Sequence, residues 1–285
     1  MAFKSAFIIL SLCSHIILAI PLDPHQEPFS QPALDYRIVG GGNAEKGSAP
    51  HMVALVFGAK VISLTCGGSI VSRRHVLTAA HCVVPFISWT GQLLETLVGV
   101  VGSNRWNTPD NLVRFSGHIN HPDYDSWHIK NDVGVLILVE NIKISDKIDI
   151  IPLNFNWVDG DVNSYATGWG RMWNHLSYEG PIPDDLQILH VRTISGQECV
   201  DGVIQASQEL GWAPPINPQV EICTFHSPNH GMCHGDSGSA LVEKHSGQQI
   251  GIVSWGFPCA QGAPDVFGRI SGFKNFLKPI LDGHL

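Results

Sequence analysis

Short apolar runs separated by turn-forming residues make up the chain after Ile38. Met52–Phe57 and Val133–Val139 are two such runs, and Gly, Asn, Asp and Pro divide them from their neighbours. The sequence holds 29 Gly and 18 Pro, so turns must be frequent. Runs of this length bounded by turn residues favour many short strands over long helices. The body of the protein is therefore expected to be all-β.

One segment has the periodicity of a helix. Within residues 271–285, apolar side chains recur at helical spacing at Phe273, Phe276, Leu277, Ile280 and Leu281. Pro279 weakens the pattern, because an interior proline removes one helical hydrogen bond and clashes with the preceding turn. We expect a helix at the C-terminal end.

The N-terminal segment has the pattern of a secretory signal peptide. Lys4 precedes a mostly apolar stretch from Phe7 to Ile20, which is shorter and more interrupted than a membrane span. Residues 1–20 are therefore predicted to be removed, with an approximate boundary, and the proline-rich residues 21–37 to form an exposed leader. No later segment is long and apolar enough to span a bilayer, so we expect residues 38–285 to form one domain of a secreted, extracellular protein that is free of the membrane.

Cysteine and charge content fit this compartment. Of the seven cysteines, Cys13 lies in the signal, and the remaining six are the even number expected for three disulfides. Their number alone leaves the pairing open. The formal charge is -8, and the 17 basic residues form no cluster, which argues against nucleic acid as a partner.

Three separate motifs carry candidate chemistry. They are Leu77-Thr78-Ala79-Ala80-His81-Cys82, Asn131-Asp132-Val133-Gly134-Val135-Leu136 and Cys233-His234-Gly235-Asp236-Ser237-Gly238-Ser239. Each is weak alone, but in the order His, Asp, Ser they resemble the trypsin and chymotrypsin family of serine peptidases. The resemblance includes Arg37-Ile38-Val39-Gly40-Gly41, Thr167-Gly168-Trp169-Gly170 and Ser254-Trp255-Gly256, and its pattern is closest to the arthropod chymotrypsin-like or collagenolytic enzymes. It implies two six-stranded antiparallel β-barrels with a C-terminal helix and a catalytic cleft between the barrels.

The chemistry of peptide hydrolysis explains these residue types. A serine hydroxyl is a poor nucleophile near neutral pH, so Ser237 needs a base, and His81 can accept its proton and pass it to the leaving amine. A buried carboxylate at Asp132 would hold the imidazole tautomer and stabilise the imidazolium. By resemblance, the backbone N–H groups of Gly235 and Ser237 form the oxyanion hole.

The resemblance also implies covalent processing. It pairs Cys66 with Cys82, Cys199 with Cys223, and Cys233 with Cys259. It further implies that an activating trypsin-like protease cuts after Arg37, and that the new amino group of Ile38 then pairs with Asp236. Protein or peptide substrates and protein inhibitors of proteases are the expected partners.

The sequence is compatible with two substrate preferences, one for large apolar residues and one that also includes basic residues. By resemblance, Gly231 lies at the base of the primary pocket, where a trypsin-like enzyme has an aspartate, and Gly256 leaves the mouth open. Backbone groups of Ser254, Trp255 and Gly256 would pair with an extended substrate. These features favour cleavage after large apolar residues. Asp265 falls on the opposite wall, as in collagenolytic enzymes of broad specificity, which also accept basic residues.

Other sites and functions have less support. His226, His230 and His234 have a spacing that suits a metal site on a helix, but Pro228 and Gly231 interrupt the run. A calcium loop at Ser103–Asn111 would hold a single acid, Asp110. We therefore expect no metal and no cofactor. The alternatives to an enzyme are a non-catalytic secreted homologue on the same scaffold and an adhesive module, for which the sequence shows no repeat.

Overall fold

The computed structural model describes residues 39–58, 61–108, 111–172, 180–257 and 259–283. Contacts within the chain separate residues 1–35 from residues 36–285, and every described element belongs to the second unit. The predicted signal peptide and leader, with Arg37 and Ile38, lie outside the described residues, as does Asp110.

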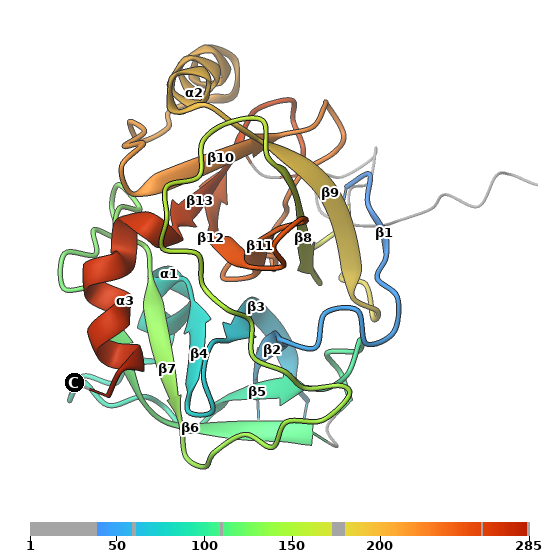
Figure 1. The fold of residues 1–285 in the computed structure, drawn as a ribbon, viewed down its shortest axis with the longest axis vertical. Helices are drawn as coiled ribbons and strands as arrows, with labels where there is room; N and C mark the ends of the chain where they lie inside the picture. Colours follow the sequence, from blue (N-terminus) through green and yellow to red (C-terminus); the bar gives the residue numbers. More distant parts are fainter. Residues whose placement is uncertain (1–38, 59–60, 109–110, 173–179, 258, 284–285) are drawn as a thin grey trace, which may run out of the picture. The chain divides into compact units, whose positions relative to one another are not determined.

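Six strands of the N-terminal half close into a barrel (Figure 1). Each strand pairs with its neighbours in antiparallel fashion. In barrel order they are β2 (Met52–Phe57), β3 (Ser63–Ile70), β4 (His75–Thr78), β7 (Gly134–Leu138), β6 (Leu112–Asn120) and β5 (Leu97–Val101).

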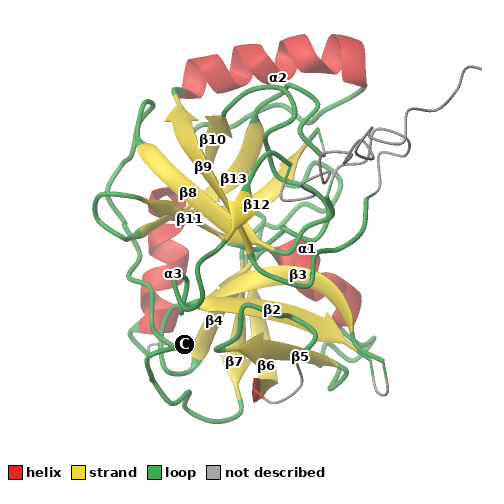
Figure 2. Ribbon diagram, turned by 90° about the vertical axis from the view of Figure 1, so that its right-hand side faces the viewer, coloured by secondary structure: helices red, strands yellow, loops and turns green. Residues whose placement is uncertain are grey.

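The C-terminal half forms a second antiparallel barrel, which the pairing of β8 with β9 closes. Its strands are β8 (Asn163–Gly168), β9 (Gln187–Ile194), β10 (Glu221–Phe225), β13 (Asp265–Arg269), β12 (Gln249–Gly256) and β11 (Ala240–Glu243). The short β1 (Gly42–Asn43) adds to the outside of β9. Figure 2 shows the two barrels packed one above the other. The expected pair of six-stranded barrels is confirmed.

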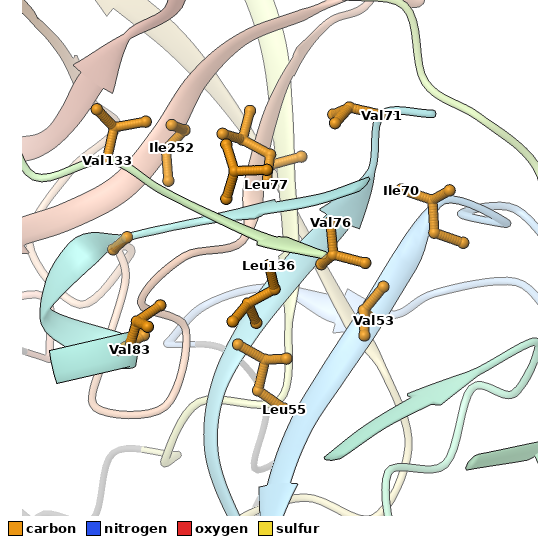
Figure 3. Packing of buried hydrophobic residues seen from close by; sticks show 14 of the residues in the cluster. Val53, Leu55, Ile70, Val71, Val76, Leu77, Val83, Val133, Leu136 and Ile252 are labelled. Atoms are coloured by element: carbon orange, nitrogen blue, oxygen red, sulfur yellow. The ribbon is translucent and has the colours of Figure 1, made fainter. Parts of the chain in front are cut away.

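Apolar packing joins the barrels. The largest cluster of buried side chains contains Leu77 and Leu136 of the first barrel, Val133, and Ile252 of β12 in the second. Figure 3 shows Ile252 beside Leu77 and Val133. Because the cluster crosses the boundary, the two barrels share apolar burial, which is the main favourable term in folding. The loops at this boundary are therefore held by both halves.

The C-terminal helix is confirmed but is shorter than the predicted segment. A 3₁₀ turn, η3 (Ile270–Phe273), leads into α3 (Lys274–Leu281). Leu277 and Ile280 on one side of α3 are buried in the core cluster. Pro279 lies inside α3 and leaves it intact. Among the described residues, no helix has the length and hydropathy needed to cross a bilayer.

A second long helix was not predicted. Segment α2 (Gly196–Leu210) lies at the end of the second barrel away from the first (Figure 2). Ser195 accepts a hydrogen bond from the Glu198 backbone, and the Glu198 carboxylate accepts one from the Ser195 backbone, which makes a capping box. Cys199 and Val203 are the buried residues of this helix. The Ser195–Glu198 cap is the sequence signal that marks the start of this helix.

The three disulfides have the pairing that the resemblance implied: Cys66–Cys82, Cys199–Cys223 and Cys233–Cys259. The first joins β3 to α1 (Ala80–Val83), which carries His81. The last joins the loop before Ser237 to the loop before β13. Two of the three bridges therefore hold the loops that carry the candidate chemistry.

Candidate active site

The pairing of β4 with β7 brings His81 and Asp132 together. Thr78, the last residue of β4, lies opposite Gly134, the first residue of β7. His81 follows β4 on α1, and Asp132 precedes β7, so the two residues lie at the same end of this antiparallel strand pair. His81 Nδ1 lies 2.7 Å from Asp132 Oδ2, and the His81 backbone N–H donates to Asp132 Oδ1 at 2.9 Å.

The carboxylate of Asp132 also receives a donor from the second barrel. The hydroxyl of Ser254, on β12, donates to Asp132 Oδ2 at 2.6 Å. Asp132 is only 3% exposed. Burial alone would raise its pKa, but the charge of His81 and the hydrogen bonds from His81 and Ser254 outweigh burial and lower the pKa. Asp132 is therefore a buried carboxylate that stays ionised.

The same pair sets the basicity of the imidazole. Burial lowers the pKa of His81, but the charge of Asp132 and the hydrogen bond to it outweigh burial and raise the pKa above 6.5. The raised pKa means that the protonated form of His81 is stabilised where it lies. This property suits a group that must hold a proton during a reaction.

Backbone hydrogen bonds hold the loop of Ser237 to one strand of each barrel. Gly67 on β3 donates its N–H to the Ser237 carbonyl at 2.7 Å, and Gly238 donates to the Val253 carbonyl at 2.8 Å. Gly238 has φ +81°, and a Cβ there would lie 2.4 Å from the Gly67 carbonyl oxygen. Only glycine fits this position without displacing the strand.

His81 and Ser237 line one open cavity of about 330 Å³ between the barrels. Between these two described side chains the structure shows no hydrogen bond. Such contacts often become short only when a substrate is bound. The remaining lining residues are Tyr124, Ser126, Ile129, Met232, Cys233, His234, Val253, Ser254, Trp255, Gly256 and Asp265.

Sequence reasoning found part of this lining. Ser254, Trp255, Gly256 and Asp265, which the resemblance assigned to substrate binding, line the cavity, and His234 lines it as well. Tyr124, Ser126 and Ile129 come from the loop before Asp132 and were missed. Their position just upstream of the Asn131-Asp132 motif was the one signal that could have indicated them. The hydroxyl of Ser254, predicted only as a backbone contact, was missed as a partner of Asp132.

Asp236 is a fully buried carboxylate beside Ser237. It accepts backbone hydrogen bonds from Gly170 at 2.8 Å and from Cys233 at 3.0 Å. A Cβ at Gly168 or Gly170 would lie within 2.2 Å of its oxygens, so the Thr167–Gly170 motif provides the space that it occupies. Burial raises the pKa of Asp236 to about 6, against the effect of the two backbone donors. Asp236 has no cationic partner among the described residues.

Asp265 is the third buried aspartate and forms part of the cavity wall. It accepts a hydrogen bond from the Met232 backbone at 3.1 Å. A Cβ at Gly231 would lie 2.8 Å from Asp265 Oδ2, so the carboxylate occupies the space beside Gly231, and Gly231 itself is not among the lining residues. Burial raises the pKa of Asp265 to about 8 against the lowering effect of the Met232 backbone donor, and the charge of Asp236 also raises it.

Comparison with known proteins decides the family. The family model described as "Trypsin" matches residues 38–277. The chain belongs to the trypsin family. It is 33% identical over 242 residues to "Chymotrypsin-2" of Vespa crabro, and this alignment covers 85% of the chain and 98% of the relative. It is 30% identical over 249 residues to "Trypsin alpha-4" of Lucilia cuprina, with 86% of the chain and 88% of the relative covered. It is 32% identical over 280 residues to "Venom serine protease Bi-VSP" of Bombus ignitus, with 92% of the chain and 73% of the relative covered.

Membership of the trypsin family identifies the chain as a serine endopeptidase, a hydrolase whose substrates are proteins. Relatives with chymotrypsin and trypsin names have similar identities to the chain, so the comparison does not choose a substrate preference. That choice depends on the residues that line the pocket of this trypsin-family member.

The three histidines of the candidate metal site do not come together in one cluster. His226 and His230 stack with ring centroids 4.3 Å apart, and both face the Ser227 hydroxyl. His234 lines the cavity instead. The described residues bring Cys66, His81 and Cys82 close enough to share a metal ion, but the two sulfurs are bonded to each other and are no longer thiolate ligands.

The titration of His81 tests the geometry of this pair. In a Ser237→Ala background, we expect the NMR-detected pKa of His81 to lie above 6.5. Adding Asp132→Asn should bring it below 6.5, because burial then acts without a compensating charge. Asp123→Asn, an exposed acid in the same loop, serves as the control and should leave the His81 pKa unchanged. Equal pKa values with and without Asp132 would contradict the arrangement.

Proposed function

We propose that this chain is a secreted zymogen that becomes an endopeptidase with the triad His81, Asp132 and Ser237. The observation that carries the proposal is the His81–Asp132 contact of 2.7 Å beside a cavity that His81 lines together with Ser237. The three disulfides support an oxidising, extracellular location. The partners are protein substrates, an activating trypsin-like protease and protein inhibitors.

The reaction proceeds through an acyl-enzyme. Ser237 Oγ attacks the substrate carbonyl while His81 Nε2 takes its proton, and Asp132 stabilises the imidazolium that forms. His81 then gives this proton to the leaving amine, and the peptide bond breaks. Water adds to the acyl group with His81 again as the base, which releases the acid and restores the Ser237 hydroxyl.

The oxyanion of each tetrahedral intermediate is bound by the N–H groups of Gly235 and Ser237. Neither N–H donates a hydrogen bond to any described acceptor, so both are free to bind a ligand. Gly235 has φ +103°, a conformation that favours glycine. In this family of reactions one such donor contributes about 3 kcal/mol to the transition state.

Activation requires cleavage after Arg37, after which the amino group of Ile38 pairs with Asp236. Two features support this step. Val39, the next residue, is 4% exposed, packs near Cys233 and Cys259, and accepts a hydrogen bond from the Gly231 N–H at 3.1 Å. Asp236 is buried with a pKa raised to about 6, and an ammonium group would supply the charge partner that stabilises its ionised form.

Blocking the cut tests activation. The Arg37→Gln precursor should remain inactive after treatment with trypsin, whereas the unaltered precursor should gain at least about 100-fold in kcat/KM because its oxyanion hole becomes ordered. The control is Arg73→Gln, which removes an exposed arginine of the first barrel and should activate normally. Full activity of uncut Arg37→Gln protein on peptide substrates would contradict this mechanism.

We propose a chymotrypsin-like preference for large apolar residues before the scissile bond near neutral pH. With its pKa raised to about 8, Asp265 is mostly protonated at pH 7 and presents a neutral wall. The broad, collagenolytic type of specificity is the second candidate, and Asp265 is the observation that favours it. Once ionised, or beside a bound guanidinium that lowers its pKa, Asp265 accepts Arg or Lys.

The pH dependence of specificity separates these readings. The ratio of kcat/KM for matched Arg and Phe peptides should rise about tenfold or more between pH 6 and pH 9, as Asp265 loses its proton. The ratio removes effects of His81 and Ile38, which act equally on both peptides. In Asp265→Asn the ratio should stay flat, as should the Leu to Phe ratio in the unaltered enzyme. A pH-independent Arg to Phe ratio in the unaltered enzyme would refute the role of Asp265.

A further inference from the structure

Glu221, the first residue of β10, is a buried carboxylate with three donors from separate segments. Its Oε1 accepts from Lys130 Nζ at 2.6 Å and from the indole N–H of Trp255 at 2.9 Å. Its Oε2 accepts from the Asn217 backbone at 2.7 Å. The side chain of Glu221 is 5% exposed and that of Lys130 is 17% exposed, so water screens this ion pair little.

The two side-chain donors belong to two walls of the substrate cavity. Trp255 lines it from β12. Lys130 ends the loop Asp125–Lys130, and paired backbone hydrogen bonds between these two residues close that loop. Ser126 and Ile129 of the loop line the cavity. The ammonium group of Lys130 also lies over the Trp255 ring, 4.9 Å from its centroid.

Glu221 therefore connects both walls through one carboxylate. Removing it would leave a little-exposed ammonium group and an indole N–H without their acceptor, a change that costs more than the loss of an exposed contact. Neither Glu221 nor Lys130 is hydrogen-bonded to His81 or Ser237 among the described residues. The side-chain contacts of Glu221 are therefore with residues of the cavity walls and not with His81 or Ser237.

We propose that Glu221 is a positioning residue: through Lys130 and Trp255 it holds the two walls that meet the substrate residues upstream of the scissile bond. The role rests on the proposed function and on the pairing of the Ser254–Gly256 backbone with an extended substrate, which the family resemblance implies. Substrate residues upstream of the scissile bond raise kcat/KM because the walls that they contact are already fixed before binding. A substrate with a single residue before the scissile bond makes no use of them.

Two substrates with the same leaving group isolate this effect. Acetyl-Phe p-nitroanilide and a four-residue peptide p-nitroanilide ending in Phe share the chemistry and differ only upstream. In activated Glu221→Gln and in Lys130→Met, kcat/KM for the four-residue substrate should fall about tenfold, mainly through KM. The value for acetyl-Phe p-nitroanilide should change less than about twofold.

Further variants distinguish positioning from general damage. Glu221→Gln/Lys130→Met should lose no more than either single change, because both remove one shared interaction. Lys130→Arg should keep most of the advantage in kcat/KM that the four-residue substrate has over acetyl-Phe p-nitroanilide. Glu209→Gln, an exposed glutamate on α2, is the matched control and should behave as the unaltered enzyme. If Glu221→Gln does not fold, Lys130→Met carries the same test.

Three results would overturn the proposal. The first is an equal fall in kcat/KM for both substrates. The second is a ratio of kcat/KM between the four-residue and the acetyl-Phe substrate that stays unchanged in both single variants. The third is a fully additive loss of kcat/KM in the double variant. Failure of the unaltered activated enzyme to hydrolyse either substrate would instead contradict the proposed function itself, and this role with it.

Discussion

The carboxylate of Asp132 lies between the two barrels and receives donors from both. His81 binds it twice from the first barrel, and Ser254 binds it from the second. A buried carboxylate is stable only where such donors surround it, and hydrogen bonds to a charged group each contribute about 1.5–3 kcal/mol. The barrels must therefore pack in one register for Asp132 to be satisfied. The same register sets Ser237 against Gly67 and opens the cavity beside His81.

Three buried aspartates show how surroundings give one residue type different properties. Asp132 has a cationic partner and a lowered pKa. Asp236 has only backbone donors and a pKa raised to about 6. Asp265 has a single backbone donor beside a cavity and a pKa raised to about 8. The proposed roles follow this order: a permanent charge in the triad, a charge completed on activation, and a proton that sets the polarity of the specificity pocket.

Much of the fold and site could be predicted from sequence, because motifs separated along the chain each require a local shape. His81, Asp132 and Ser237 stand next to strands and glycines that fix their backbone, and the disulfide pairing followed from the family resemblance. Helix α2 was not predicted from apolar periodicity, although the Ser195–Glu198 cap marks where it begins. The contact of Lys130 with Glu221 joins residues 91 apart in sequence, and nothing local to either residue indicates it.

Covalent labelling of Ser237 tests the central claim most directly. A serine-directed organophosphonate should label the enzyme with one equivalent after cleavage behind Arg37, and mass spectrometry should find the label on Ser237. The uncut precursor should react slowly, and the cut Ser237→Ala and His81→Ala variants should not react. Labelling at another residue, or peptide hydrolysis retained by cut Ser237→Ala protein, would contradict the account.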